Sequence, residues 1–273
     1  MKAFEILEHF YSLADWVDPE KTVDKIIIGD PEKEVKRILV CWMSDLRAVK
    51  AAIDGGYDML MTHEPTFWIH ANEIRTMDQE AQPSQKSEAR NHKRRLIEES
   101  GLVIMRNHDV WDLIPEIGIP WAWADFLGIE GEPVAFGAAR YQHRYDIEPI
   151  SLDDFARRIA QRTALIGEPQ VQVFGDGGRL VSKVGIGTGC ACSIEIFKYM
   201  GCDVSIVCDD GSCYWHDISW AMEIGHPVIR VNHGTSEEPG MVTLTKYINE
   251  NLEGVEAVHL PRTCGIRLIG REG

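Results

Sequence analysis

Three short polar clusters in this 273-residue chain combine histidine with a carboxylate. They are Thr62-His63-Glu64-Pro65, Asn107-His108-Asp109-Val110-Trp111-Asp112 and Asn232-His233-Gly234-Thr235-Ser236-Glu237. Each directly follows a short apolar run that is typical of a β-strand. Imidazole nitrogens and carboxylate oxygens are the ligands that zinc, manganese and iron take in proteins. The candidate set of three histidines and three acids exceeds what one tetrahedral ion needs, and it suits two ions bridged by a carboxylate. Its members are His63, Glu64, His108, Asp112, His233 and Glu237.

Each cluster alone also has an ordinary structural explanation. A histidine after a strand is often a surface or core residue, and an acid at such a place can cap a helix or lie in its first turn. Three strand ends that all carry histidine and acid are harder to explain by capping. The joint pattern therefore favours a metal site.

The elements that must position these clusters alternate as they do in α/β proteins. The polar stretch 70–95 predicts an exposed loop that leads into a helix ending at Gly101, and 132–144 predicts extended chain. Residues 174–179 predict a turn between strands. Helices are expected at 2–14, 46–54, 151–163, 193–200 and 216–224 and after Pro239, and strands at 25–28, 37–43, 57–63, 102–108, 184–187, 203–208, 227–232 and 255–259.

An internal repetition relates the two parts of the chain. A shift of 145 positions lays Gly56-Tyr57-Asp58 on Gly201-Cys202-Asp203, and a shift of 125 positions lays Asn107-His108 on Asn232-His233. Matches of this size also arise by chance in α/β proteins. We interpret the repetition as an α/β fold of two similar halves, 1–130 and 131–273, each a sheet flanked by helices, with the metal site in the cleft between them.

Composition narrows the class of protein. The chain carries 43 acidic and 28 basic residues, a net charge of −15, which disfavours binding to nucleic acid. It contains no apolar run of the ~18 residues that a membrane span needs, and its first residues lack the apolar core of a secretory signal. We therefore expect a cytoplasmic protein with reduced thiols. The seven cysteines contain no C-x-x-C spacing, which disfavours a structural zinc ribbon.

Several other residues have both a functional and a structural interpretation. The glycines of 185–189 could cradle a phosphate or form a tight strand-to-helix turn. Arg106 and Arg230 could neutralise a substrate anion or face solvent, and Asp209 or Asp210 could reach the site. Four further histidines are expected at the surface, namely His9, His70, His92 and His143.

In order and spacing, the clusters resemble the Nif-three-like family of proteins with a dinuclear metal centre. The segment 59–65 is similar to the family's apolar strand ending in His-His-Pro, with Glu64 in place of the second histidine. His108 and Asp112 match a His-x-x-x-Asp element, and 232–240 is similar to an element near the C-terminus. A Gly/Ser-rich turn at 184–193 and a later histidine, His216, also match, and the likeness extends over about residues 36–260.

The resemblance implies two divalent ions, with zinc, manganese, iron or magnesium all open. His63, Asp112, His233 and Glu237 would be metal ligands. Glu64 would be a further ligand that favours manganese, magnesium or iron over zinc, unless it leaves one site weak. His108 and His216 would be catalytic groups that transfer protons near the metals.

The same resemblance implies a homohexamer with a ring shape. It also implies a metal-dependent hydrolase acting on a small molecule, because many relatives are described as type-two GTP cyclohydrolases that act on a purine nucleotide. The alternative is a non-enzymatic metal-binding scaffold or regulatory protein.

Overall fold

A computed structural model describes residues 1–79, 84–262 and 269 of the chain. Contacts divide these residues into two compact units. Unit 1 comprises Met1–Gly118 and Met241–Pro261, and unit 2 comprises Ile119–Gly240 together with Arg262. The sequence predicted halves at 1–130 and 131–273. The observed division differs because 119–129 contributes to the core of unit 2, while a strand near the C-terminus joins the sheet of unit 1.

Unit 1 contains a five-stranded sheet in the order β1-β4-β3-β2-β11. Strands β2 (Arg37–Met43), β3 (Met59–Glu64) and β4 (Val103–Arg106) run parallel to one another. At the edges, β11 (Glu256–His259) is parallel to β2, and β1 (Ile26–Ile28) is antiparallel to β4. Since parallel strands end at the same edge of a sheet, the segments after β3 and β4 are neighbours.

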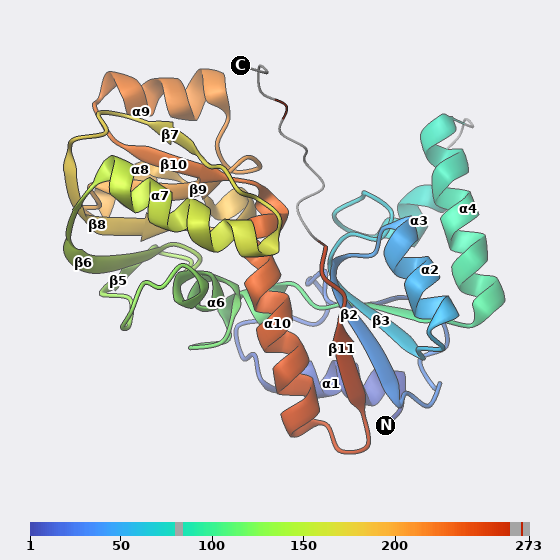
Figure 1. The fold of residues 1–273 in the computed structure, drawn as a ribbon. Helices are drawn as coiled ribbons and strands as arrows, with labels where there is room; N and C mark the ends of the chain where they lie inside the picture. Colours follow the sequence, from blue (N-terminus) through green and yellow to red (C-terminus); the bar gives the residue numbers. More distant parts are fainter. Residues whose placement is uncertain (80–83, 263–268, 270–273) are drawn as a thin grey trace. The chain divides into compact units, whose positions relative to one another are not determined.

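Helices cover the sheet of unit 1 (Figure 1). Helix α2 (Leu46–Asp54) begins where the Asp45 side chain accepts a hydrogen bond from the Ala48 backbone N–H, at 2.7 Å. Apolar side chains of α2 and α4 pack on alternate residues of the strands, such as Leu39, Leu60 and Ile104. The remaining helices of this unit are α1 (Ala3–Ser12), α3 (Glu73–Asp78), α4 (Gln85–Ser100) and α5 (Asp109–Leu113).

Unit 2 contains a six-stranded sheet in the order β5-β6-β8-β9-β10-β7. Its central strands, β8, β9 and β10, are parallel. The predicted turn at 174–179 does separate two strands, but these do not pair with each other, because β7 pairs with β10 at the far edge. The bounds are β5 (Ala135–Phe136), β6 (His143–Ser151), β7 (Gln172–Phe174), β8 (Leu180–Ile186), β9 (Val204–Cys208) and β10 (Val228–Val231).

The core of unit 2 lies between this sheet and its helices. Helix α7 begins at the predicted cap, Ser151, whose hydroxyl accepts from the Asp154 N–H at 3.2 Å, and it crosses one face of the sheet (Figure 1). Leu152, Phe155 and Ile159 of α7 belong to the core cluster. The helical elements are α6 (Ile119–Phe126), α7 (Leu152–Thr163), η1 (Ala164–Ile166), η2 (Gly189–Ala191), α8 (Ile194–Tyr199), η3 (Tyr214–Ile218) and α9 (Ser219–Glu223).

The last helix, α10 (His233–Asn251), begins earlier than predicted. The sequence indicated a helix after Pro239, because proline lacks the N–H that an internal helical position donates. Pro239 instead lies inside the helix. The residues before it already have helical hydrogen bonds, as in Ser236 N–H to Asn232 O at 3.2 Å. His233 and Glu237 therefore lie one turn apart on a helix.

The internal repetition is present in the two sheets. Each contains three parallel strands in chain order, β2-β3-β4 and β8-β9-β10, followed by an antiparallel neighbour at the last strand. Asp58 and Asp203, which the shift of 145 positions aligns, form equivalent hydrogen bonds. Asp58 accepts from the Arg37 N–H at 3.0 Å, and Asp203 accepts from the Ser182 N–H at 3.1 Å, so each binds the backbone of the preceding parallel strand.

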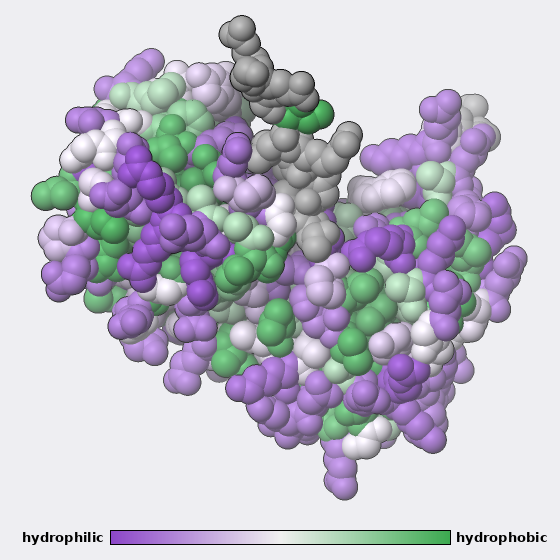
Figure 2. All heavy atoms as spheres, in the orientation of Figure 1, coloured by the Kyte–Doolittle hydropathy of each residue, from purple (hydrophilic) through white to green (hydrophobic). Residues whose placement is uncertain are grey.

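Burial corrects one of the histidine predictions. His143 is fully buried rather than at the surface, with its ring 4.2 Å from that of Trp121. Burial lowers the pKa of His143 to about 4. His92 is exposed as predicted. On the visible face, hydrophobic residues lie in small groups among hydrophilic ones (Figure 2). Within the described ranges, no helix is both long and apolar enough to span a membrane.

Candidate functional site

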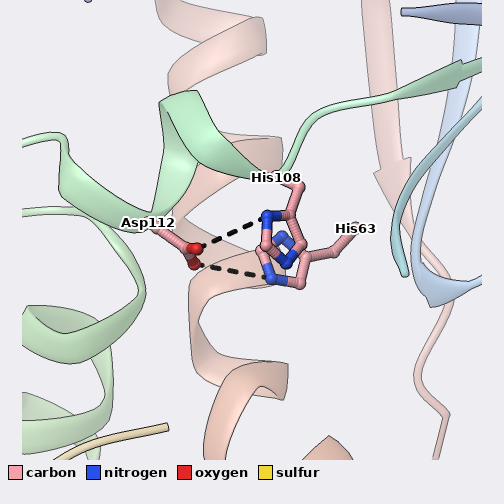
Figure 3. A group of neighbouring side chains, drawn as sticks. All are labelled: His63, His108 and Asp112. Carbon is pink, nitrogen blue, oxygen red and sulfur yellow. Dashed lines mark ion pairs between the residues drawn. The ribbon is translucent and has the colours of Figure 1, made fainter. Parts of the chain in front are cut away.

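Three of the predicted site residues come together in unit 1. His63 lies at the end of β3, His108 follows β4, and Asp112 lies on α5. Each offers a ligand atom, and these atoms all lie within 4.8 Å of one another. Figure 3 shows the Asp112 carboxylate facing both imidazoles. This is the convergence that the parallel strands β3 and β4 predict.

The hydrogen bond on one side of the His63 ring determines what the other side can do. His63 Nδ1 lies 3.1 Å from the backbone carbonyl oxygen of Asn107. A carbonyl only accepts, so Nδ1 carries the proton, and in the neutral ring Nε2 is then an acceptor. Nε2 lies 3.5 Å from Asp112 Oδ1, which is also an acceptor. Two acceptors that face each other need a cation between them, either a proton or a metal ion.

The separation of these two acceptors matches a pair of metal ligands. Two donors bound about 2.1 Å from one ion lie roughly 3.0 Å apart at adjacent octahedral positions and roughly 3.4 Å apart at tetrahedral ones. The 3.5 Å between His63 Nε2 and Asp112 Oδ1 is close to the tetrahedral value and longer than an ordinary hydrogen bond. The donor set therefore fits a divalent metal ion.

His108 lies against His63 and has its own carboxylate partner. The two imidazole rings stack with centroids 4.4 Å apart. His108 Nδ1 lies 2.8 Å from Asp109 Oδ1 and 3.6 Å from Asp112 Oδ2. Burial disfavours the charged ring, but the charge of Asp112 and the hydrogen bond to Asp109 outweigh it and raise the pKa of His108 to about 9. His108 is therefore equipped to hold a proton beside the Asp112 carboxylate.

A buried carboxylate, Asp24, holds the turn that presents these residues. Its oxygens accept backbone hydrogen bonds from His108 N at 2.5 Å, Asp109 N at 3.0 Å and Val110 N at 2.7 Å. These groups begin the short helix that carries Asp112. Burial raises the pKa of Asp24 to about 6. Asp109 is held in turn by the Thr22 hydroxyl, which donates to Oδ2 at 2.7 Å.

Arg106 supports the strand end rather than offering its charge to a substrate. Its side chain is fully buried and donates to the carbonyl oxygens of His63 at 2.8 Å and His70 at 2.6 Å. Its third nitrogen lies 4.0 Å from Glu64 Oε2. The interpretation of Arg106 as a substrate-neutralising group therefore gives way to a positioning role. That Glu64 binds metal stays a prediction.

The other two predicted ligands come together in unit 2. His233 and Glu237 lie one turn apart on α10, with His233 Nε2 2.9 Å from Glu237 Oε2. The other ring nitrogen, Nδ1, lies 3.8 Å from Asp210 Oδ2, and the backbone N–H of His233 donates to Asp209 Oδ1 at 2.6 Å. Ligating histidines in metalloproteins commonly have a carboxylate on the nitrogen that does not bind metal. Asp210 thus lies beside the His233 ring, whereas Asp209 holds the backbone at the start of α10.

The glycine turn at 185–189 is explained by packing against its surroundings. A Cβ at Gly185 would lie 2.6 Å from the Phe197 ring. At Gly189, where φ is +51°, it would lie 3.0 Å from Glu237 Oε1 and 3.1 Å from His233 Nε2. The turn therefore leaves room for the His233 and Glu237 side chains. Arg230, the other candidate for a substrate anion, donates to Gln172 Oε1 at 2.9 Å and to the Ser212 carbonyl at 3.0 Å.

His216 lies at the surface of unit 2. Its ring is largely exposed, and Nδ1 lies 2.9 Å from Asp217 Oδ1. It lines a groove whose walls do not include His233 or Glu237. A proton-transfer role for His216 stays a prediction.

Sequence reasoning missed two residues of the unit 1 set. Asp24 precedes β1, far from the clusters along the chain, and no spacing rule connects it to His108. Asp109 lies inside the second histidine-carboxylate cluster, 107–112, and its position directly after a histidine was a usable signal. His70 is exposed as predicted, yet its ring packs edge-on 5.8 Å from that of His108.

Known structures share this fold over nearly their full length. The protein ybgI has 20% identity and a TM-score of 0.77, with 97% of this chain and 100% of that one covered. Protein SA1388 of Staphylococcus aureus has 17% identity and a TM-score of 0.79, with coverage of 98% and 99%. Reduced HcgD from Methanocaldococcus jannaschii has 21% identity and a TM-score of 0.70, with coverage of 95% and 98%. These likenesses establish the fold.

No curated protein matches the chain. A family model does match it, over residues 1–263, and that family is described as Duf34/NIF3, NGG1p interacting factor 3. The match includes both ligand sets and both sheets, and it confirms the resemblance that the histidine and carboxylate motifs predicted. The chain belongs to the DUF34/NIF3 family.

Proposed function

We propose that the protein is a metal-dependent hydrolase that binds divalent ions through two ligand sets, one in each unit. The first set is His63 and Asp112, and the second is His233 and Glu237. The observation that carries the proposal is the orientation of His63. Its Nδ1 faces a carbonyl and its Nε2 faces a carboxylate oxygen at 3.5 Å, which suits a metal ion between them.

Divalent ions at these ligands would polarise a scissile bond and lower the pKa of a water molecule toward neutrality. The chain's own residues have separate tasks. His63 and Asp112 would bind the metal ion. Asp24 and Arg106 hold the chain segments that carry these two residues. His108 holds a proton on Nδ1 toward Asp109, so the ring is fixed in orientation beside Asp112. It is the residue that we assign to proton transfer.

A groove in unit 1 adjoins this set and suits an anionic small molecule. Its volume is about 440 Å³, within the range of small-molecule sites. Thr22 and His70 line it, and these same residues contact Asp109 and His108. The groove contains three basic residues, Lys21, Lys25 and Arg75, and two acids, Glu20 and Glu73. The carboxylate of Glu73 already accepts from the Phe67 N–H at 2.5 Å. A purine nucleotide is one substrate of this class.

Metal content is the first experiment. The protein, loaded separately with manganese, iron, zinc and magnesium and then dialysed, is analysed for bound metal. We expect close to two ions per chain. We also expect a clear loss in a His63→Ala, His233→Ala double variant and no loss in a His92→Ala control, whose histidine is exposed. Less than one ion per chain under metal-replete conditions would contradict the proposal.

Turnover is the second experiment. The loaded protein is tested on nucleotides, phosphodiesters and cyclic amides, with the same double variant as the blank. For a productive anionic substrate, Lys25→Met and Arg75→Met should raise KM more than they lower kcat, because these residues bind and do not react. Metal binding without turnover above the blank would favour the alternative, a non-enzymatic metal-binding scaffold.

The dinuclear arrangement and the homohexamer are also part of this proposal. Magnetic coupling between two manganese ions, seen by electron paramagnetic resonance, would support a shared centre, because such coupling requires ions a few ångströms apart. Light scattering after gel filtration would test for six chains of 30.8 kDa. A monomer at micromolar concentration would contradict the hexamer and leave the metal proposal standing.

A further inference from the structure

A second groove lies on unit 2, where α8, η3 and α9 meet. Its volume is about 500 Å³, and its walls include Trp215, Trp220, Glu195 and Glu223. Helix α9 is on the outer side of this unit, beyond β7 (Figure 1). Neither His233 nor Glu237 lines the groove, so it is separate from the ligand set of unit 2.

Two exposed indoles form the aromatic part of this groove. Trp215 is 77% exposed and Trp220 is 38% exposed, although tryptophan is highly buried in most proteins. Trp215 lies in η3, which is a single turn of π-helix, and Trp220 follows in α9. Turns of this rare kind occur often at functional sites. The faces of exposed indoles attract organic cations, because the ring quadrupole is negative above and below the plane.

The charged part of the groove is acidic. Glu195, Asp217 and Glu223 line it, and among the residues that the structure describes no lysine or arginine lines the walls. Asp217 has internal partners, since it accepts from the Cys213 N–H at 2.7 Å and lies 2.9 Å from His216 Nδ1. Glu195 and Glu223 form no ion pair with any residue in the described part of the chain. Two carboxylates are thus available to a ligand with more than one positive charge.

We infer that this groove binds an aliphatic polyamine. Such a molecule has ammonium groups separated by three or four methylenes. Its ammonium groups complement Glu195 and Glu223, while its methylenes pack on Trp215 and Trp220 and its remaining N–H groups face the indole planes. The open groove admits a flexible, extended chain, and its volume lies within the range of small-molecule sites.

Titration with spermidine tests the inference, by calorimetry and by tryptophan fluorescence at low and at physiological salt. The metal-loaded protein is used, so that the ligand sets of both units are occupied. Trp215→Ala should weaken binding about 3- to 10-fold, as expected for loss of an exposed cation–π contact and its packing. Glu195→Gln with Glu223→Gln should weaken it by a similar factor, because each exposed ion pair contributes little.

Matched variants separate this site from general attraction to a protein of net charge −15. Glu130→Gln with Glu148→Gln removes the same charge from exposed positions of unit 2 outside the groove, and Tyr199→Ala removes an exposed ring outside it. Both should bind spermidine as the parent does. All variants should keep the parent's circular dichroism and thermal midpoint, because every substituted side chain is at the surface.

Three results would overturn the inference. One is the absence of saturable spermidine binding up to millimolar concentration at low salt. Another is equal weakening by the Glu130→Gln, Glu148→Gln control, which would show non-specific attraction to the acidic surface. The third is self-association that Trp215→Ala abolishes and spermidine does not affect, which would show that the indoles contact a second copy of the chain.

Discussion

Asp112 Oδ1 lies 3.5 Å from His63 Nε2, and neither atom has a proton to share when the histidine is neutral. The ring is fixed in this orientation, because His63 Nδ1 faces the Asn107 carbonyl at 3.1 Å. An arrangement of two facing acceptors is stable only around a cation. The chemistry of unit 1 therefore depends on which cation is present, a proton or a metal ion.

Removing either acceptor should abolish this metal site. We expect His63→Ala or Asp112→Ala to lower metal affinity by at least about 100-fold, since loss of a group that only supports a ligand already costs 10- to 100-fold. Competition with a coloured chelator measures the affinity. The parent, in contrast, should be stabilised by metal in a thermal melt. An unchanged affinity in both variants would show that the cation between these residues is a proton.

Replacing Asp24 should weaken the site without touching a proposed ligand. Asp24 accepts backbone hydrogen bonds from His108, Asp109 and Val110. Asp24→Ala removes the carboxylate that these three N–H groups share as acceptor. We expect a loss of about 2–4 kcal/mol in the free energy of unfolding and a 10- to 100-fold loss of metal affinity. Urea unfolding and chelator competition measure the two effects. Asp18→Asn is the control, because that acid is exposed and its contacts are with Lys21 and the Glu20 N–H of its own turn.

Replacing Arg106 with an apolar residue should lower the stability of the folded protein. Arg106→Met keeps much of the side-chain volume but removes the donors to the carbonyls of His63 and His70. It also removes the positive charge that lies 4.0 Å from Glu64 Oε2. We expect a loss of about 2–4 kcal/mol in unfolding free energy, because buried acceptors lose charged donors. Arg94→Met is the comparison, since its ion pairs lie at the surface and should contribute less than about 1 kcal/mol each.

His226 should make the protein less stable in acid. Burial, with Lys198 and Arg179 nearby, lowers the pKa of His226 to about 4, and His226 Nε2 lies 2.7 Å from Ser205 Oγ. Between pH 6.5 and pH 4 the unfolded chain binds a proton at this position that the folded protein does not. The free energy of unfolding therefore falls as the pH falls through this range, by about 2 kcal/mol between pH 7 and pH 5.

The test of this pH dependence compares His226→Gln with the parent by urea unfolding at pH 7 and pH 5. The difference in unfolding free energy between the two proteins should shrink by about 2 kcal/mol at pH 5, because the variant has no proton to bind there. His92→Gln, at an exposed position, should differ from the parent in unfolding free energy by the same amount at pH 7 and at pH 5. A parent and variant that lose stability in parallel would exclude His226 as the cause.

Much of the fold could be predicted from local patterns. The runs at 37–43 and 203–208 are apolar and β-branched, and both are buried parallel strands. Ser151 caps its helix as predicted. Pairing was less predictable. The turn at 174–179 looks like a hairpin, but β7 pairs with β10, since strand partners are chosen by the packing of the whole sheet.

The histidines at 108 and 143 show the same difference between what the local sequence predicts and what tertiary packing decides. His108 was singled out because it follows a strand and precedes Asp112 by four residues, which on a helical turn places both on one face. His143 has polar neighbours along the chain, yet it packs beside Trp121 and Phe136 in unit 2. Burial depends on residues that are distant in sequence, and no local pattern reports them.

The sequence by itself determined which residue types stand at the ends of the parallel strands, because strand and helix periodicity are local properties of the chain. It therefore pointed to the family and the repeated halves and, through the family resemblance, to His63, Asp112, His233 and Glu237 as candidate metal ligands. Only the tertiary structure decided the partners of those residues. Asp24, Asp109 and Arg106 fix the segments that carry the candidate ligands of unit 1 through contacts between segments far apart in the chain, and such contacts exist only once the sheet has formed.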